Sequence, residues 1–560
     1  MTSTKHGDYR WWKEAVVYQI YPRSFNDSTG DGVGDIPGIV EKVEYLDELG
    51  VDVVWLCPVY ESPMADNGYD IADYRSIHPE FGAMDDWENL LSELHDRGIR
   101  LIMDLVVNHT SDEHEWFRRS RGGDAEYEDY YYWREGDDGP PNNWDSFFGG
   151  SAWSYDEERG EYYLHLFDEK QPDLNWRNET VREEVYEMMR WWLEKGIDGF
   201  RMDVINLVSK TEGLPDGDPD ETVTGTEHVV DGPRSTEYIG EMCDRAFEGA
   251  DVMTVGEMIG ADADTALEYV GEDGCGLSML IHFEHMSVDT GDGGKWDVVD
   301  LDLLELKEIV TDWQETLAGE GWNCLYLSNH DQPRAVSRFG DDGEYREESA
   351  KMLATFLFTL RGTPFIYQGQ EIGMTNTTFE EPADIRDVEA ENFVESSLES
   401  DVYDSYEEVR PIVESRSRDN ARTPIQWSAD EHAGFTDGEP WIDVADDYEA
   451  VNVEEARADR GSVWHYYREL IDLRREDDLF VYGEYDLLLP DHPEVFAYAR
   501  TLAGRTLLVV CNFFDGEPAV DLPALADAAS PELVTGNYRT ETQSDETVEL
   551  RPYEARVYEL

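Results

Sequence analysis

Basic residues are scarce in this 560-residue sequence, which has 44 Lys and Arg against 127 Asp and Glu and a formal net charge of −83 at pH 7. The acidic residues are spread along the whole chain instead of being gathered in one tail. Such a charge repels nucleic acid and anionic membranes at low salt, so we predict neither as a partner. Because molar salt screens charges beyond about 3 Å, we interpret the composition as halophilic adaptation. The alternative is an ordinary acidic surface.

Cysteines and long apolar runs are also rare. The five cysteines are odd in number and form no Cys-x-x-Cys pair, which argues against a disulfide framework and a zinc site. Cys57 and Cys324 stand in apolar, strand-like runs, as buried packing residues do. No run of about 18 apolar residues occurs, and the N-terminus has no apolar leader. We therefore predict no membrane span, no secretion signal and a cytoplasmic location.

Short apolar runs rich in β-formers alternate with stretches of helical periodicity. Strands are predicted at residues 16–21, 51–58, 100–107, 199–204, 252–257, 278–283, 324–328 and 364–367. Helices are predicted between them at residues 36–49, 85–97, 180–195, 301–318 and 344–360. Eight strand–helix units indicate an α/β fold, a closed parallel (β/α)8 TIM barrel, and not an open sheet.

Two intervals interrupt this alternation. Residues 109–173, rich in Trp, Tyr, Gly and Asp, are predicted to form a small domain inserted after the third strand. Residues 373–427 are an acidic, partly helical excursion after the eighth strand. From residue 479 the pattern changes to short alternating strands, which predicts a C-terminal antiparallel β-sandwich at 479–560. The barrel would then comprise residues 1–108 and 174–478.

Charged residues recur where the predicted barrel strands end. In such barrels the chemistry lies at the C-terminal ends of the strands. The residues at these ends are Asp104, His109, Arg201, Asp203, Glu257, His330 and Asp331. A single Asp after a strand is usually a helix cap or turn residue. Seven charged or titratable residues at the same end of one barrel instead indicate a common pocket.

Paired carboxylates are the catalytic candidates, because no Cys/His or Ser/His arrangement is visible. Cleaving a glycosidic bond requires one carboxylic acid to protonate the leaving oxygen and one carboxylate to handle the oxocarbenium-like carbon. Arg201 lies two residues before Asp203 on the same strand face, so we expect it to keep Asp203 ionised at neutral pH. Glu257 follows an apolar run, and we expect its pKa to be raised for proton donation.

Four segments resemble the signature regions of the α-amylase family, family 13 of the glycoside hydrolases. They are Asp104-Leu-Val-Val-Asn-His109, Gly199-Phe-Arg-Met-Asp-Val204, Val255-Gly-Glu-Met258 and Ser328-Asn-His-Asp331. The segment Gln171-Pro-Asp-Leu-Asn175 resembles the mark of the oligo-1,6-glucosidase and α-glucosidase branch. The resemblance runs in the expected order from about Trp11 to the C-terminus.

The resemblance implies roles for these residues. Asp203 would be the nucleophile, Glu257 the general acid/base and Asp331 the transition-state stabiliser of a retaining reaction. The implied pocket for the terminal glucose consists of Asp66, Tyr69, His109, Arg201, His330 and Arg422, with Arg418 nearer the opening. An Asp/Arg pair that grips sugar hydroxyls would close the far end of the cleft. We therefore expect an exo-acting α-glucosidase for short saccharides. For Arg418 and Arg422, the alternative is a structural salt bridge.

Val204, which follows the nucleophile, bears on the linkage that is cleaved. Within this branch valine tends toward α-1,6 and threonine or alanine toward α-1,4, which favours isomaltose; barrel packing is the alternative reading. One apolar-for-polar exchange discriminates by only about 1–3 kcal/mol, so activity on maltose or sucrose, or an α-1,4-specific maltase, stays open. Phe148 and Phe167 are predicted to stack on the second sugar ring or to pack in a core.

Three other functions are known on this fold. Sucrose isomerases, which are transglucosidases, also carry the valine, but their Arg-Leu-Asp-Arg-Asp loop is absent here, where the chain has Gly294-Lys-Trp-Asp-Val-Val-Asp-Leu-Asp302. A trehalose-6-phosphate hydrolase needs cationic phosphate contacts, and no basic cluster lies near the motifs. Non-catalytic relatives, the transporter heavy chains, should carry a membrane span and lack the catalytic carboxylates. We therefore expect a hydrolase, as a monomer or weak homo-oligomer.

A separate motif, at residues 27–35, suggests a metal site. Oxygen-bearing side chains alternate there with small residues, but the twelfth position is Gly38 and not the Glu of an EF-hand. Many relatives bind Ca²⁺ or Mg²⁺ at this place. The resemblance implies one structural Ca²⁺ or Mg²⁺ ion and no organic cofactor, with ligands from the Val33 carbonyl and the side chains of Asp27, Thr29, Asp31 and Asp35. The alternative is a metal-free acidic turn.

Overall fold

The fold is given by a computed structural model, which describes residues 10–136, 139–271, 274–400, 402–528, 531–539 and 547–560. Residues 1–9, on which the prediction of no leader partly rests, lie outside this set. Among the described residues, none of the helices combines the length and apolar character that a membrane crossing requires.

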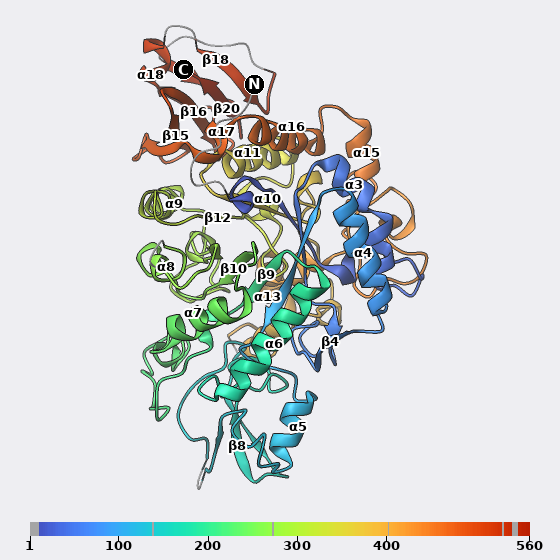
Figure 1. Ribbon diagram of the computed structural model, residues 1–560. Coiled ribbons are helices and arrows are strands. Elements are labelled where there is room, and N and C mark those ends of the chain that lie inside the picture. Colours follow the sequence, from blue (N-terminus) through green and yellow to red (C-terminus); the bar gives the residue numbers. More distant parts are fainter. Residues whose placement is uncertain (1–9, 137–138, 272–273, 401, 529–530, 540–546) are drawn as a thin grey trace.

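Eight parallel strands form one sheet that curves into a nearly closed barrel (Figure 1). They are β1 (Val17–Ile20), β2 (Val53–Leu56), β5 (Arg100–Val106), β9 (Gly199–Asp203), β10 (Met253–Glu257), β11 (Met279–Ile281), β12 (Cys324–Leu325) and β13 (Thr363–Tyr367). Their order in the sheet is β11-β10-β9-β5-β2-β1-β13-β12. The predicted TIM barrel is confirmed. Most strands are shorter than predicted, because the apolar runs continue beyond the residues that pair.

Burial on both faces explains the continuous apolar runs. All four residues of β2 are buried, as expected for a parallel strand between a packed interior and a ring of helices. The helices after the strands are α2 (Ile36–Glu41), α3 (Val43–Leu49), α4 (Met84–Asp96), α6 (Glu179–Lys195), α7 (Ser235–Ala246), α8 (Ala263–Val270), α9 (Leu303–Thr316) and α11 (Arg346–Thr359). The single helix predicted at 36–49 is wrong, because Lys42 leaves helical geometry (φ −106°, ψ 3°) and divides it.

Local signals place the helix ends. Asn178 caps α6 by accepting a hydrogen bond from the Thr180 N–H, and Gly196 ends it with φ 109°, a left-handed conformation that glycine adopts without strain. Helix α4 buries Trp87, Leu90, Leu91 and Leu94, spaced by three and four residues along one stripe. The amphipathic helices thus pack against the barrel and leave its strand ends free to carry the chemistry.

Between β5 and α6 the chain leaves the barrel and returns beside its point of departure. The excursion contains α5 (Glu115–Arg121) and a sheet with the order β6-β8-β7, formed by β6 (Trp133–Arg134), β7 (Trp153–Asp156) and β8 (Glu161–Leu164). A β-bridge joins His109 to Asp173, so the two ends of the segment lie side by side. In Figure 1 this segment and the C-terminal sheet lie at opposite ends of the molecule.

The C-terminal part is an antiparallel sheet with the order β14-β15-β16-β20-β18. Its strands are β14 (Glu484–Leu488), β15 (Val495–Leu502), β16 (Arg505–Asn512), β18 (Glu532–Gly536) and β20 (Ala555–Glu559), and β17 (Ala519–Asp521) pairs separately with β19 (Thr547–Glu549). Side chains of both sheets, such as Val510 and Val548, share one apolar core. Tyr498 reaches the barrel, where its hydroxyl lies 2.5 Å from Thr359 Oγ1 at the end of α11.

After β13 the chain forms a second excursion over the barrel mouth. It contains α12 (Val388–Glu399), α13 (Tyr406–Arg416) and the short α14 (Asp419–Arg422). A small apolar core of its own holds α12 to α13, including Val394, Val409 and Val413. This packing fixes the residues around 418–422, which belong to the site described below.

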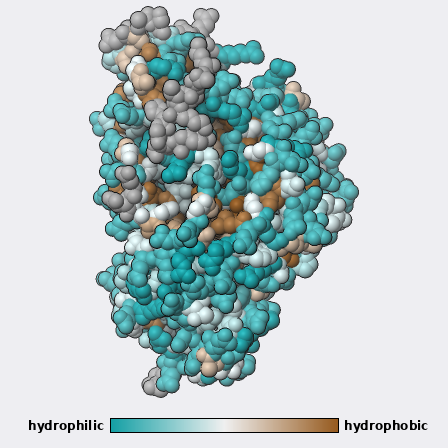
Figure 2. Space-filling model, viewed as in Figure 1, coloured by the Kyte–Doolittle hydropathy of each residue, from teal (hydrophilic) through white to brown (hydrophobic). Residues whose placement is uncertain are grey.

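The surface is largely hydrophilic on the face seen in Figure 2. Within the described residues, the large hydrophobic side chains that are exposed are few: Tyr155, Val298, Val299, Leu304 and Val402. A net charge of −83 on such a surface repels itself unless salt screens it.

We expect the melting temperature to fall by several degrees when KCl is lowered from about 3 M to about 0.1 M, because the screening length grows from a few Å to about 10 Å. Calorimetry measures this. Trimethylamine oxide, an uncharged excluded solute, serves as the control and should not replace KCl at low ionic strength. An unchanged melting temperature would favour the ordinary acidic surface.

Two histidines are buried beside the barrel, after β11. The His282 ring stacks on Trp313 with 3.7 Å between ring centroids, and the His285 ring lies 4.7 Å away. Burial lowers the pKa of both, and that of His285 falls to about 4. Since the unfolded chain protonates these rings near pH 6.5, their neutral burial stabilises fully above that pH and progressively less below it.

The His282→Phe variant keeps the stacked ring and removes the titration. Between pH 7.5 and pH 5, we expect the wild type to lose about 2 kcal/mol of unfolding free energy relative to this variant. Urea unfolding at fixed molar salt measures the difference, and the salt holds surface self-repulsion constant. If the free energy of unfolding depends on pH in the same way for both proteins, the lowered pKa of His282 is contradicted.

Candidate active site

The C-terminal ends of the barrel strands surround a cavity of about 440 Å³. Predicted site residues that line it are Asp66, Tyr69, His109, Phe148, Phe167, Asp203, Val204, Glu257, Asp331 and Arg418. Arg201, His330 and Arg422 are almost fully buried and contact members of this set. The structure thus brings together all thirteen residues predicted for catalysis and substrate binding.

Arg201 is the charged centre of the site. Its guanidinium is fully buried, and Nη1 donates to Asp104 at 2.6 Å and to Asp203 at 2.7 Å. Nη2 donates to Glu257 Oε1 on the neighbouring strand β10. Arg201 and Asp203 are two residues apart on β9, so the strand places them on one side. One cation therefore contacts three carboxylates.

The protonation of Asp203 depends on more than Arg201. Burial raises the pKa of Asp203 well above its usual range; Arg201 opposes this rise, and the charges of Glu257 and Asp104 add to it. The prediction that Arg201 keeps Asp203 ionised is therefore wrong, since it neglected burial and the neighbouring carboxylates. The charge state of Asp203 is therefore set by burial and by its acidic neighbours as well as by Arg201.

Val204 has a strained backbone directly after Asp203. Its φ of 35° and ψ of 43° lie in the left-handed region, which is costly for a β-branched residue. Its N–H donates to Glu257 Oε2 at 3.2 Å. The side chain lines the cavity and also joins an apolar cluster with Trp144 and Leu207. Both sequence-based readings of Val204, as a pocket residue and as a packing residue, thus describe its surroundings.

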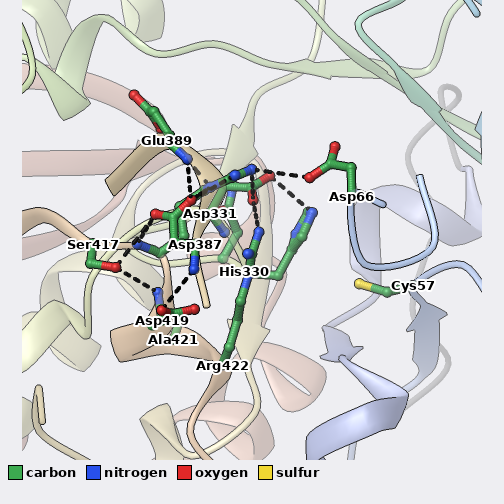
Figure 3. A network of polar contacts seen from close by, with 12 residues as sticks. Cys57, Asp66, His330, Asp331, Asp387, Glu389, Ser417, Asp419, Ala421 and Arg422 are labelled. Carbon is green, nitrogen blue, oxygen red and sulfur yellow. Dashed lines mark hydrogen bonds and ion pairs between the residues drawn. The ribbon is translucent and has the colours of Figure 1, made fainter. Parts of the chain in front are cut away.

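A network of ion pairs joins residues of the cavity lining to the buried Arg422 (Figure 3). Arg422 Nη2 lies 3.0 Å from Asp331 Oδ1, and Arg418 Nη1 lies 3.6 Å from Asp331 and 3.7 Å from Asp66. Although burial raises it, the pKa of Asp331 is held well below its usual range by His330, Arg418 and Arg422. Asp331 is therefore ionised, and the salt-bridge reading of the two arginines coexists with a place in the pocket.

Several buried polar atoms beside this network have no hydrogen-bond partner. Among the described residues, Asp66 Oδ1, Tyr69 Oη and Arg422 Nη1 make no hydrogen bond. Burying such groups unpaired costs free energy, so each needs an explanation. The Tyr69 ring also stacks on His330 at 5.1 Å between centroids. Unpaired donors and acceptors beside an aromatic ring suit a ligand with many hydroxyl groups.

The aromatic residues predicted in the inserted segment lie at the outer part of the cavity. The Phe148 ring lies 5.0 Å from the Arg418 guanidinium, and the Phe167 ring lies 5.2 Å from the His109 ring. Both phenylalanines are half-buried. Burial lowers the pKa of His109 to about 4, so this histidine is neutral at pH 7.

Two contributors were missed from the sequence. Gln171 Nε2 lies 3.2 Å from both Asp66 Oδ2 and His109 Nε2, and it stands in a segment that was recognised as a motif. Asp387 accepts from Arg418 Nε at 2.8 Å and from the Glu389 N–H at the start of α12. Asp387 has no motif around it, and only the fold shows that it holds Arg418.

Comparison with known proteins fits this geometry. Residues 19–483 match the family described as Alpha amylase, catalytic domain, and residues 485–557 match Maltogenic Amylase, C-terminal domain. The chain belongs to the α-amylase family. It is therefore a glycoside hydrolase, as the motifs predicted.

Individual relatives extend over nearly the whole chain. An oligo-1,6-glucosidase of Parageobacillus thermoglucosidasius is 55% identical over 98% of this chain and 99% of its own length. The solved structure of Bacillus licheniformis trehalose-6-phosphate hydrolase is 48% identical, with a TM-score of 0.93 over 98% of this chain and 100% of that one. That of isomaltulose synthase from Klebsiella sp. LX3 is 42% identical, with a TM-score of 0.95 over 99% and 100%.

The loop of residues 27–35 lies outside the lining of the catalytic cavity and leads from η1 (Pro22–Ser24) to α2. Asp27 accepts from the N–H groups of Thr29, Gly30 and Gly32, each at 2.8 Å. Asp35 caps α2 by accepting from the Gly38 N–H at 2.6 Å. A metal ion would have to compete with these donors. In the part of the chain that the structure describes, no three His, Cys, Asp or Glu side chains form a metal-binding group. The predicted Ca²⁺ or Mg²⁺ site therefore stays a prediction.

If this loop binds a structural ion, a chelator should lower the melting temperature, because ligand lost from the folded state destabilises it. The measurement compares scans with and without EDTA at fixed molar salt. Asp31→Ala is the matched variant: Asp31 is exposed and only its Oδ1 is engaged, by the Val33 N–H at 3.1 Å. The variant should melt near the chelated wild type and not respond to EDTA. A wild type indifferent to EDTA would indicate the metal-free turn.

Proposed function

We propose that this enzyme is a retaining, exo-acting α-glucosidase that hydrolyses terminal α-1,6-linked glucose from short isomaltose-type saccharides. The observation that carries the proposal is a set of buried polar atoms beside the ion-pair network: Asp66 Oδ1, Tyr69 Oη and Arg422 Nη1 have no hydrogen-bond partner. We infer that the network closes the inner end of the cavity, so that only a chain terminus fits there. The similarity to a protein named oligo-1,6-glucosidase supports the linkage.

The contacts of Arg201 support a double-displacement reaction. Glu257 protonates the glycosidic oxygen while the Asp203 carboxylate attacks the anomeric carbon, which forms a glucosyl ester and leaves Glu257 ionised. Glu257 then takes a proton from water, the water oxygen displaces Asp203, and glucose leaves with its configuration retained. The negative charge moves between two carboxylates that both contact Arg201. Asp331, held ionised by Arg422, stabilises the positive charge on the sugar.

A phosphorylated substrate suits this cavity poorly. Each of the cations in its lining already faces an acid: Lys295 pairs with Glu389, Arg338 and Arg416 with Asp289, and Arg418 with Asp387. A phosphate group would have to break one of these pairs within a strongly acidic protein. We therefore favour neutral saccharides, despite the similarity to a trehalose-6-phosphate hydrolase.

Sucrose isomerisation is the second candidate, because an isomaltulose synthase shares the fold at 42% identity. Retaining the fructose after the first step would require binding groups on the acceptor side. The isomerases' arginine-rich loop is replaced here by residues 294–302, which contain three acids and one lysine. This difference favours transfer to water.

The location and working conditions belong to the same proposal. The five cysteines are free in the described structure, which suits a reducing cytoplasm. We propose an enzyme that acts in molar salt as a monomer or weak homo-oligomer.

Product analysis with isomaltose, maltose and sucrose tests the proposal. Isomaltose should be cleaved with the highest kcat/KM, and glucose should first appear as the α-anomer. Glu257→Gln, of nearly equal volume, should lower kcat/KM by about 10²- to 10⁴-fold without changing the fold. Isomaltulose as the main product from sucrose would indicate an isomerase, and maltose as the best substrate an α-1,4-glucosidase. If the enzyme hydrolyses none of the three substrates, the proposed function is contradicted.

A further inference from the structure

A second cavity, of about 530 Å³, adjoins the catalytic one. The two share Phe147, Phe148 and Glu389 in their linings, so the second cavity borders the first. One wall is the turn of residues 147–150 in the inserted segment, and the other is α12. We call this second cavity the outer groove.

Helix α12 presents one face to the outer groove. Glu389, Asn392, Phe393, Ser396 and Glu399 line it and are spaced by three or four residues, as neighbours on a helix face are. The opposite side of the helix, with Ala390 and Val394, is buried in the small core of the excursion. The lining face is therefore held in place from behind.

The two walls are also joined directly. Asn392 Nδ2 donates to the Phe148 carbonyl oxygen at 3.2 Å, which links α12 to the turn of the inserted segment. Glu389, at the boundary between the cavities, pairs with Lys295 and lies 3.9 Å from Arg418 Nε. The hydrogen bond from Asn392 to the Phe148 carbonyl thus holds the two walls of the outer groove together.

An aromatic pair lines the outer groove. The rings of Trp296 and Phe393 are parallel within 4°, with centroids 4.3 Å apart, and both residues are half-buried. Pyranose rings stack on aromatic side chains through their C–H faces, and carboxylates and amides accept or donate to their hydroxyls. Glu389, Glu395 and Glu399 make the groove negative, which disfavours an anionic chain and leaves a neutral one.

We propose that the outer groove binds the third glucose unit of an isomalto-oligosaccharide, with Trp296 and Phe393 as its platform. The inference rests on the proposed function. The terminal unit occupies the closed end and the second unit lies near Phe148, so the third unit emerges on the far side of Phe148, where the groove begins. The preferred substrate is then a trisaccharide or longer chain.

The test compares kcat/KM for isomaltose, isomaltotriose and isomaltotetraose. The wild type should prefer isomaltotriose over isomaltose by about fivefold, as one aromatic stacking contact would give, with little further gain for the tetraose. Trp296→Ala should abolish this preference through KM and change kcat/KM for isomaltose by less than about twofold. Trp296→Phe, which keeps a ring, should retain part of the preference. Tyr155→Ala, at an exposed aromatic outside the groove, is the matched control and should behave as wild type.

Binding to Glu257→Gln gives a second readout without turnover. Isomaltotriose should bind this variant more tightly than isomaltose, and the added Trp296→Ala should remove the difference. A wild type that prefers isomaltose, or a Trp296→Ala protein that loses both substrates equally while its melting temperature is unchanged, would overturn the outer groove as a binding site. Absence of isomaltose hydrolysis by the wild type would instead contradict the proposed function.

Discussion

A single fully buried guanidinium, that of Arg201, compensates three carboxylates at the mouth of the barrel. Without it, Asp104, Asp203 and Glu257 would be buried around one point with no cation between them, and burying unpaired charges costs many kcal/mol. The two carboxylates proposed for catalysis lie on adjacent strands and bond to different nitrogens of the same group. The register of β9 against β10 therefore fixes the distance over which charge moves during the reaction.

Two excursions from the barrel supply the remainder of the site. The inserted segment supplies His109, Phe148 and Phe167, and the segment after β13 supplies Arg418 and Arg422. Asp387 links Arg418 to helix α12, because it caps this helix and also accepts a hydrogen bond from Arg418. The ionised state of Asp331 thus depends on a helix whose own stability comes from a small apolar core elsewhere. The barrel strands that carry the carboxylates and the excursion that carries Arg418 are thus stabilised by separate apolar cores.

The barrel and the residues of the site could be predicted because short segments of the sequence identify both. Apolar runs of strand length specify the eight barrel strands, and the motifs at their ends contain Asp203, Glu257 and His330. The contact of Asp387 with Arg418 and the pKa of Asp203 depend on residues far away in the chain, and no local pattern contains them. The loop at Asp27 shows the reverse case: alternating oxygen ligands are visible in sequence, yet the same oxygens accept backbone N–H groups in the fold.

The inserted segment leaves and re-enters the barrel at one narrow point, where His109 pairs with Asp173 and the buried Lys210 contacts Asp173 and Asn108. A segment closed at its base in this way can change in sequence and length without disturbing the strands that hold the carboxylates. Evolution can therefore alter what the pocket accepts while inheriting its chemistry unchanged. Solved structures named as a hydrolase and as a synthase are similar to this chain over nearly its whole length.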